Sequence, residues 1–381
     1  MTRIDPPSSD ASKGPQAPVV VYGATGYTGK LVTAEFARRG VPMVLAGRSA
    51  EKLTAAAALA GPLVRNTIVA SLSDHDALCR VAGAGTVLAN CAGPFAHTGG
   101  PVLRACAAAG THYLDTTGEQ GWIHRAFEDH DDELRRADVA AVPGMGLDFA
   151  PGDLLAHLVG VAVEPCTRIV IAYHLEGFGM TRGTQRSLLE AMGGRDIGFV
   201  DGDWATGAGA RPVREFMTFP GAIGRQRVAR YPAGEVVTVP RHVRTGEMVL
   251  RISGASVMPR ASWVLPVTAP LLPSLLRTPA KGLLDRVIGR LPEGPSEDAR
   301  RAVRWTITAE ATGQDGRVAR GIVSGPDVYG LTAVTIADGA AALGAENFAG
   351  RGVLAPAQAL DPATTLDALA EFGVEWSVDA R

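Results

Sequence analysis

Three glycines follow a run of β-branched residues near the start of the chain. The string at residues 19–29 reads VVVYGATGYTG, so the glycines are Gly23, Gly26 and Gly29. The apolar run predicts a buried parallel strand, and a turn into a helix beside a pyrophosphate needs positions without a Cβ atom. The helix expected over 30–39 would direct its N-terminal amides at the phosphates. The pattern predicts a dinucleotide site, and its alternative is a tight turn that binds nothing.

Basic residues follow the second expected strand, at 43–46. An enzyme that prefers NAD usually has an acidic residue there for the ribose 2′-hydroxyl, whereas this chain has Arg48, Ser49 and Lys52. Such residues suit a 2′-phosphate, so NADPH is favoured over NADH. The alternative for Arg48 is an ordinary solvated surface charge.

The next two expected strands end in small and polar residues. Ser71 follows the third strand, where the adenine would lie, and a turn of small residues follows the fourth strand at the level of the nicotinamide. The expected contacts in this turn are Asn90, Cys91, Ala92, Gly93, Pro94 and Phe95. No neighbour in the sequence would obviously lower the pKa of the Cys91 thiol, so a buried structural thiol is favoured over a nucleophile.

Reduction by a nicotinamide cofactor also requires a proton donor. The run THYLDTTGE at 111–119 places Tyr113, Asp115 and Glu119 near the cofactor. The proton could come from Tyr113, from His97 or from a water molecule held by Asp115. Asp115 and Thr117 are equally good caps for the next helix, so the sequence leaves the donor open.

Two further segments predict substrate contacts. The loop PGMGLDFAPGD at 143–153 leads into a second domain, and we expect it to form the floor of the cleft with Met145. The segment GMTRGT at 179–184 precedes a helix expected at 185–192, and Thr181, Arg182 and Thr184 could hold a substrate oxygen there. Glu119 completes the predicted substrate contacts. Plain helix capping, with Arg182 solvated, is the alternative for the second segment.

The elements that must position these residues alternate between strand and helix. Six apolar strands and intervening helices up to residue 142 predict an α/β fold with an N-terminal Rossmann domain, a doubly wound parallel sheet. Beyond Pro151 the pattern predicts an α+β domain with a mostly antiparallel sheet. Its expected strands are 168–174, 213–219, 226–230, 236–239, 247–252, 305–312 and 317–323. The expected organisation is a disordered tail at 1–17, a Rossmann domain at 18–150, a substrate and oligomerisation domain at 151–335, and C-terminal helices at 336–381 that return to the first domain.

Composition excludes several classes of protein. A formal net charge of −2 gives no cationic excess for nucleic-acid binding. The cysteines Cys79, Cys91, Cys106 and Cys166 show no metal-ligand spacing, which predicts a reduced, cytoplasmic, metal-free protein. The first 17 residues contain no apolar core and therefore predict no signal peptide.

One apolar stretch has no obvious role. Residues 261–276 carry no charged side chain but contain three prolines and are too short to span a bilayer. The segment 283–291 that follows predicts a helix with one apolar face. A lid, an oligomer contact, a peripheral membrane patch and ordinary packing against the neighbouring sheet are the alternatives.

The order of these motifs resembles the saccharopine dehydrogenase-like oxidoreductases. The matching motifs are GATGYTG at 23–29, AGRS at 46–49, NCAGPF at 90–95, THYLDTTGE at 111–119 and PGMGLDFAPGD at 143–153. Within that group the chain is most similar to the trans-acting enoyl reductases of bacterial polyketide lipid pathways, which share the GMTRGT-like segment and a VLAPAQAL-like run, here at 353–360. The cofactor contacts that the resemblance implies are Gly23, Thr25, Gly26, Tyr27, Thr28, Gly29, Arg48, Ser49, Asn90, Gly93 and Pro94. Ser71 departs from the acidic residue often found at its position.

The resemblance also implies an activity. We expect an NADPH-dependent reductase that transfers hydride to the C=C bond of an enoyl group on a polyketide, lipid or other secondary metabolite, free or carrier-bound. A homo-oligomer without a membrane-spanning segment is expected. One alternative is reduction of a C=N bond, closer to saccharopine chemistry, and another is a non-catalytic regulator that senses NADP.

Overall fold

The first of two sheets is parallel throughout. The computed structural model describes residues 17–193, 196–207, 215–257 and 286–380. The described strands of this sheet, in spatial order, are β3 (Val64–Val69), β2 (Met43–Gly47), β1 (Val19–Tyr22), β4 (Val87–Asn90), β5 (His112–Asp115), β6 (Ala140–Val142) and β15 (Gly352–Val353). The order reverses between β1 and β4, as in a Rossmann sheet. The predicted doubly wound domain is confirmed.

Alternate residues of each strand face two helical layers. Val19 and Val21 pack in one cluster with α1 (Tyr27–Arg38), α2 (Ala50–Ala60) and α14 (Val328–Leu343), whereas Val20 and Tyr22 face the other layer. That layer consists of α3 (His75–Ala82), α4 (Phe95–Ala109) and α5 (Gln120–Arg136). Both faces of the sheet are therefore covered, which explains why its strands read as continuous apolar runs.

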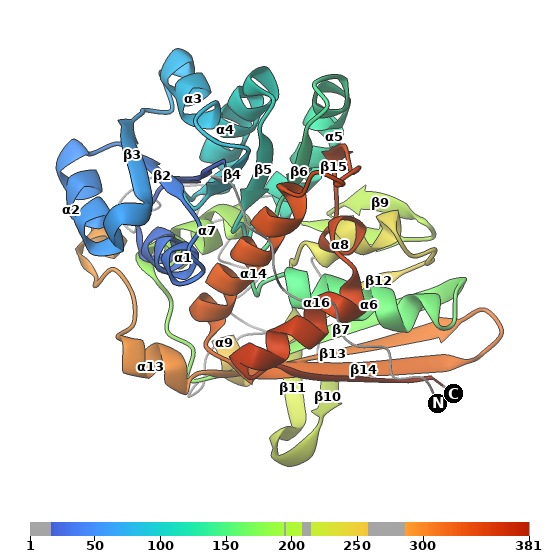
Figure 1. The fold of residues 1–381 in the computed structure, drawn as a ribbon. Helices are drawn as coiled ribbons and strands as arrows, with labels where there is room; N and C mark the ends of the chain where they lie inside the picture. Colours follow the sequence, from blue (N-terminus) through green and yellow to red (C-terminus); the bar gives the residue numbers. More distant parts are fainter. Residues whose placement is uncertain (1–16, 194–195, 208–214, 258–285, 381) are drawn as a thin grey trace, which may run out of the picture.

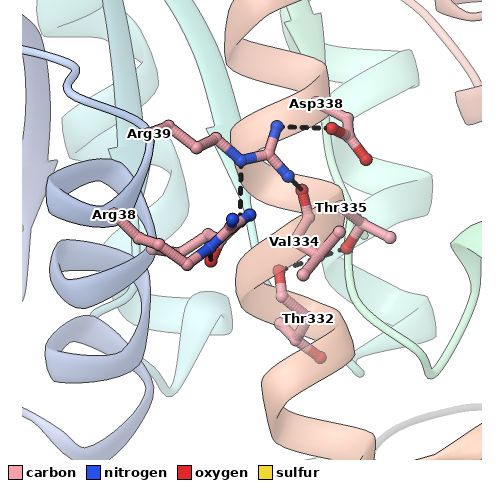
Figure 2. Close-up of polar contacts among 7 residues, drawn as sticks. Arg38, Arg39, Thr332, Val334, Thr335 and Asp338 are labelled. Atoms are coloured by element: carbon pink, nitrogen blue, oxygen red, sulfur yellow. Dashed lines mark hydrogen bonds and ion pairs between the residues drawn. The ribbon is translucent and has the colours of Figure 1, made fainter. Parts of the chain in front are cut away.

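Helix α14 comes from the C-terminal part of the chain but packs against α1. Arg39, at the end of α1, bridges the two helices because its guanidinium contacts Glu35 at 2.7 Å and Asp338 at 2.6 Å (Figure 2). The same guanidinium reaches the Val334 carbonyl oxygen at 3.5 Å. This contact links α14 to α1 of the Rossmann domain.

The second sheet lies below the first domain in Figure 1 and is mixed. Its strands, in spatial order, are β10 (Glu215–Phe219), β11 (Gly224–Arg230), β12 (Met248–Ser253), β7 (Cys166–Glu176), β13 (Arg304–Gly313), β14 (Val318–Pro326) and β16 (Glu375–Ala380), and the hairpin of β8 (Ile197–Val200) and β9 (Asp203–Thr206) joins β12. Neighbours pair antiparallel except β12 and β7, which run parallel. The expected mostly antiparallel sheet is present.

Further helices lie between and beside these layers. Helix α6 (Ala150–Val161) leads from the parallel sheet to the second one and packs on β13 and β14. The other described helices are η1 (Gly61–Leu63), α7 (Arg182–Gly193), η2 (Gly221–Ile223), α8 (Glu235–Thr238), η3 (Val239–Arg241), α9 (Gly254–Val257), α13 (Glu297–Ala302), α15 (Pro356–Ala359), α16 (Pro362–Ala368) and η5 (Leu369–Phe372). In the part of the chain that is described, no helix is long and apolar enough to cross a membrane.

One expected strand is wrong. Residues 236–239 belong to α8 and η3, although valine and threonine favour strands. The run is wholly buried, so it shows no periodicity that would distinguish a helix from a strand. The turn is closed by a hydrogen bond from the Thr238 amide to the Gly234 carbonyl oxygen at 3.1 Å.

Other expectations lie wholly or partly outside the described residues. These are the tail at 1–17 except its last residue, the first two residues of the expected strand 213–219, the apolar stretch 261–276, and the first residues of the segment 283–291. The domain limits stay predictions. Within the C-terminal part, α14 and β15 join the first domain, whereas β16 pairs with β14 in the second sheet.

Candidate functional site

The loop after β1 forms a cradle that only glycine fits. Gly23 has a φ of +82°, and a Cβ atom there would lie 2.9 Å from the Ala92 backbone nitrogen. A Cβ atom on Gly29 would lie 2.2 Å from the Gly23 carbonyl oxygen. Gly26 precedes α1 and has no side chain, so it does not cap the first backbone amides of the helix. The predicted loop therefore leaves a helix N-terminus open for a phosphate group.

The same loop touches the turn after β4. Because β1 and β4 are neighbours and the strand order reverses between them, their carboxyl ends border the crevice in which such sheets bind ligands. The Cys91 amide bonds the Tyr22 carbonyl oxygen at 2.8 Å. The structure thus brings together the predicted cofactor residues of the first loop and those of 90–95. Burial, and next the charge of Asp115, raises the pKa of the Cys91 thiol to about 12, which leaves it an unreactive thiol.

The residues after β2 lie at the surface. Ser49 caps α2 by accepting a hydrogen bond from the Lys52 amide at 3.4 Å. Arg48 is exposed and forms no ion pair with any residue in the described ranges. Ser71, which follows β3, is also exposed and bonds the Ser73 hydroxyl at 3.1 Å.

Tyr27 faces the second half of the chain. Its hydroxyl donates to the Pro295 carbonyl oxygen at 2.9 Å, and its ring meets Tyr329 edge-on at 5.3 Å between centroids. Lys30, one turn further along α1, pairs with Glu293 at 2.7 Å. Tyr27 thus closes one side of the first loop, next to the partly buried Thr25 and Thr28.

A buried polar network lies under the ends of β4 and β5. The Asp115 carboxylate, 0% exposed, accepts four hydrogen bonds. The donors are the Tyr113 hydroxyl at 2.8 Å, the Trp122 indole at 2.7 Å, the Thr117 amide at 3.0 Å and the Gly144 amide at 2.8 Å. The Tyr113 hydroxyl, on a residue that is also 0% exposed, accepts a hydrogen bond from the Asn90 side-chain nitrogen Nδ2 at 3.2 Å. This geometry supports a positioning role for both predicted catalytic residues. His97, the third, is exposed on α4.

Glu119 caps a helix from outside it. Its carboxylate accepts from the Phe95 amide at 2.8 Å and the Ala96 amide at 2.7 Å, at the start of α4. Ser187 of α7 donates to the same carboxylate at 2.7 Å. Glu119 therefore joins the loop after β5 to the turn after β4 and to α7.

Hydroxyl groups cluster at the start of α7. Thr181 caps this helix, because its hydroxyl accepts from the Thr184 amide at 3.0 Å. The Tyr329 hydroxyl accepts a hydrogen bond from the Thr181 backbone amide and forms another with the Thr184 hydroxyl, both at 3.0 Å. Arg182 is directed elsewhere and donates to the Gly289 carbonyl oxygen at 3.2 Å. Met145 is 1% exposed and packs under α14 in the core.

A second group of acids and phenols was missed. Asp148 is partly buried in the loop between β6 and α6, and its carbonyl oxygen accepts from the Tyr173 hydroxyl at 3.2 Å. That hydroxyl also contacts the carboxyl group of Glu235, which is 0% exposed. Tyr231 packs on Tyr173 at 5.1 Å between ring centroids. Asp148 lies in the motif PGMGLDFAPGD at 143–153, but nothing local in the sequence indicates its tertiary partners.

Burial dominates the electrostatics of this group. It raises the pKa of Asp148 to about 6 and that of Glu235 well above its usual range. Burial likewise raises the pKa of Asp115 to about 6, although its four donors favour the charged form. Perturbed acids of this kind gather at functional sites more often than elsewhere.

A family model matches the part of the chain that carries this site. Residues 19–142 match the saccharopine dehydrogenase NADP binding domain. The first domain of this chain is therefore similar to that domain. The predicted resemblance is confirmed for this domain, and its glycine cradle and open helix N-terminus fit the phosphates of the dinucleotide.

Curated relatives carry oxidoreductase names. A trans-acting enoyl reductase of Mycobacterium leprae (strain TN) is 35% identical over 140 residues, which are 36% of this chain and 34% of that protein. A saccharopine dehydrogenase-like oxidoreductase of Bos taurus is 33% identical over 152 residues, which are 36% of this chain and 35% of that protein. The chain thus spans about a third of the length of these relatives.

The fold as a whole also has a solved counterpart. The apo saccharopine dehydrogenase (L-Glu forming) from Saccharomyces cerevisiae superposes with a TM-score of 0.58. The superposition covers 96% of this chain and 100% of that one, at 13% sequence identity. The likeness shows that the two-sheet fold is shared.

Proposed function

We propose that this protein is an NADPH-dependent reductase that acts on the activated C=C bond of an enoyl compound. The observation that carries the proposal is the glycine cradle of an NADP-binding domain beside the exposed Arg48. The names of the curated relatives support a reductase and favour an enoyl acceptor. When bound, the cofactor would supply a hydride to the acceptor.

The residues proposed to hold the cofactor lie along the carboxyl ends of four neighbouring strands. The first loop and the N-terminus of α1 would bind the pyrophosphate, and Arg48 with Lys52 would pair with the 2′-phosphate. The complete set is Gly23, Thr25, Gly26, Tyr27, Thr28, Gly29, Arg48, Ser49, Lys52, Ser71, Asn90, Cys91, Ala92, Gly93, Pro94 and Phe95. Among these, Asn90 would act by shaping the turn, because its carboxamide oxygen accepts from the Ala92 amide at 3.0 Å.

The acceptor would enter between the two sheets, next to α7. Thr181 and Thr184 with Tyr329 offer hydroxyl groups to an acceptor carbonyl oxygen, while Glu119 fixes α7 against the first domain. A carrier-bound acceptor, a homo-oligomer and a cytoplasmic location stay predictions. Sedimentation of the purified protein would test the oligomer.

The fall in absorbance at the NADPH band measures the consumption of the cofactor and so tests the function. We expect NADPH consumption with a 2-enoyl thioester, and none with a keto acid plus an amine. The reverse result would select C=N reduction, and NADPH binding without turnover on either would favour a regulator. The variant Gly29→Ala should abolish binding, because its Cβ atom would meet the Gly23 carbonyl oxygen. Gly121→Ala is the matched control, since its φ is not positive and the nearest atom to a Cβ there, on the Arg125 side chain, lies 4.0 Å away.

A further inference from the structure

Asp148 lies at the end of the crevice where β5 and β6 finish. These strands are parallel neighbours, with Leu114 opposite Val142. Gly118 follows β5, and a Cβ atom on it would lie 3.0 Å from Asp148 Oδ2. The Asp148 carboxyl group therefore rests against the loop after β5, on the side of the sheet where the nicotinamide half of a dinucleotide is expected.

The backbone at Asp148 is fixed, whereas its carboxyl group is not engaged. The Tyr173 hydroxyl holds the Asp148 carbonyl oxygen, and Tyr173 is itself held by Glu235 and packed on Tyr231. No residue of the described ranges hydrogen-bonds the Asp148 carboxyl oxygens. A fixed and partly buried acid with an unused carboxyl group is placed to exchange a proton with a ligand.

The other acids and phenols nearby are less suitable. Asp115 and Tyr113 are fully buried and hydrogen-bonded to each other. Glu235 is 0% exposed behind Tyr173, next to Gly152 of α6. Tyr231 is partly buried and remains the strongest competitor, because no residue of the described part bonds its hydroxyl.

We propose that Asp148 is the acid that protonates the acceptor after hydride addition, a role that rests on the reductase function proposed above. After hydride addition the acceptor is an enolate. The O–H bond of the Asp148 carboxylic acid breaks, and the enolate electron pair forms a C–H bond at the carbon beside the carbonyl group. The Asp148 carboxylate that remains regains a proton from water.

The surroundings of Asp148 keep a larger fraction of it protonated near neutral pH than an ordinary aspartate has. Burial raises its pKa to about 6. The titratable groups that face it are Tyr173 of β7, Tyr231 after β11, Glu235 of α8 and Tyr329 of α14. All four are acids that carry no positive charge, so they place no cation beside Asp148 that would stabilise its charged form, and burial raises the pKa of each as well.

Asp148→Asn tests the role in turnover. We expect kcat for a 2-enoyl thioester to fall at least about 100-fold, the contribution usual for a general acid, with the Kd for NADPH unchanged. In the wild-type protein kcat should fall as the pH rises through the pKa of Asp148, and the variant should lose this dependence. Asp201→Asn, in the exposed turn between β8 and β9, is the matched control and should behave as the wild type.

Carbon-13 NMR of aspartate carboxyl groups tests the acid without cofactor or acceptor. Asp115 and Asp148 should both give resonances that titrate near pH 6, and one of the two should disappear in Asp148→Asn, whereas both should persist in Asp201→Asn. Gly118→Ala should shift the same resonance, because the added methyl group meets the carboxyl oxygen. A spectrum in which Asp148→Asn removes only a resonance titrating near pH 4, the ordinary range, would overturn the inference.

The outcomes separate this inference from the proposed function. If the wild-type protein and Asp148→Asn consume NADPH equally, Asp148 is not the donor although the reductase function stands. If Tyr231→Phe instead removes the pH dependence, Tyr231 is the donor. If the wild-type protein consumes no NADPH with any enoyl thioester, the proposed function falls and the inference falls with it.

Discussion

Two aspartates near the ends of neighbouring strands have opposite surroundings. Asp115 accepts four hydrogen bonds and is sealed in the core, whereas Asp148 is partly buried with an unengaged carboxyl group. A carboxylate that is fully satisfied stabilises a fixed geometry, and one that is not can bind or exchange protons. We therefore assign positioning to Asp115 and proton transfer to Asp148.

Arg48 offers the sharpest test of cofactor preference. Arg48→Ala should weaken NADPH binding by about 10- to 100-fold, the loss expected for a charge-assisted hydrogen bond to phosphate. NADH lacks the 2′-phosphate, so its binding should change by less than about 3-fold, within the effect of an exposed charge. Fluorescence titration with both cofactors measures this difference. Equal losses would contradict the 2′-phosphate assignment.

Glu235 makes stability depend on pH. Burial, partly offset by the Tyr173 hydrogen bond, holds its pKa well above the value of an unfolded glutamate. The folded state thus binds the proton more tightly, and stability is lost as the pH rises from about 4.5 towards the folded pKa. The side chain of Glu235→Gln does not titrate, so the variant should not lose stability in this way. The difference in the free energy of unfolding, variant minus wild type, should therefore increase from pH 5 to pH 8. Urea denaturation at both values measures it, and a constant difference would show that Glu235 is already charged.

At the residue scale, local signals predicted part of the site. The glycines of the first loop could be identified because their spacing after a strand has a direct physical reason, and the role of Arg48 stays a prediction. Tyr173 and Glu235 could not, because they meet Asp148 only through tertiary contacts, 25 residues away in the case of Tyr173. Met145 was predicted to form the cleft floor, but its side chain is 1% exposed and packs in the core.

At the scale of elements, α4 depends on a cap from another loop. Pro94 precedes the helix and offers no side-chain cap. The Glu119 carboxylate accepts hydrogen bonds from the Phe95 and Ala96 backbone amides instead. Glu119→Gln should lower the free energy of unfolding by about 1–3 kcal/mol, because it removes charge-assisted bonds from buried amides. Ser187→Ala is the control, with a loss of about 1 kcal/mol or less, since it removes one of three bonds. Thermal denaturation distinguishes the two, and similar losses would refute the capping role.

Helices and strands could be predicted from hydrophobic periodicity where one face of the element is solvated. The hairpin of β13 and β14 was predicted because a turn of glycine and polar residues separates two apolar runs. The segment 236–239 was predicted incorrectly because burial on all sides removes periodicity. Sequence patterns alone also could not show that β12 and β7 pair in parallel, since register across distant strands depends on tertiary packing.

At the scale of the molecule, the C-terminal segment ties the two sheets together. β15 extends the parallel sheet beside β6, and β16 pairs with β14 in the second sheet. Removing residues 350–381 should therefore increase amide hydrogen exchange in both sheets, because both lose an edge strand. Removing only 374–381 should affect the second sheet alone. Exchange that stays unchanged in β6 after the longer deletion would contradict this arrangement.

The central claim is that NADPH reduces the C=C bond of an enoyl acceptor in the crevice at the β-strand ends. Mass spectrometry of the product formed with NADPH deuterated at C4 tests it most directly. The proposed function predicts that a saturated thioester gains one deuterium atom from one of the two C4 epimers of the cofactor. NADPH consumption that places no deuterium in the product, or a deuterated amine instead of a saturated thioester, would contradict it.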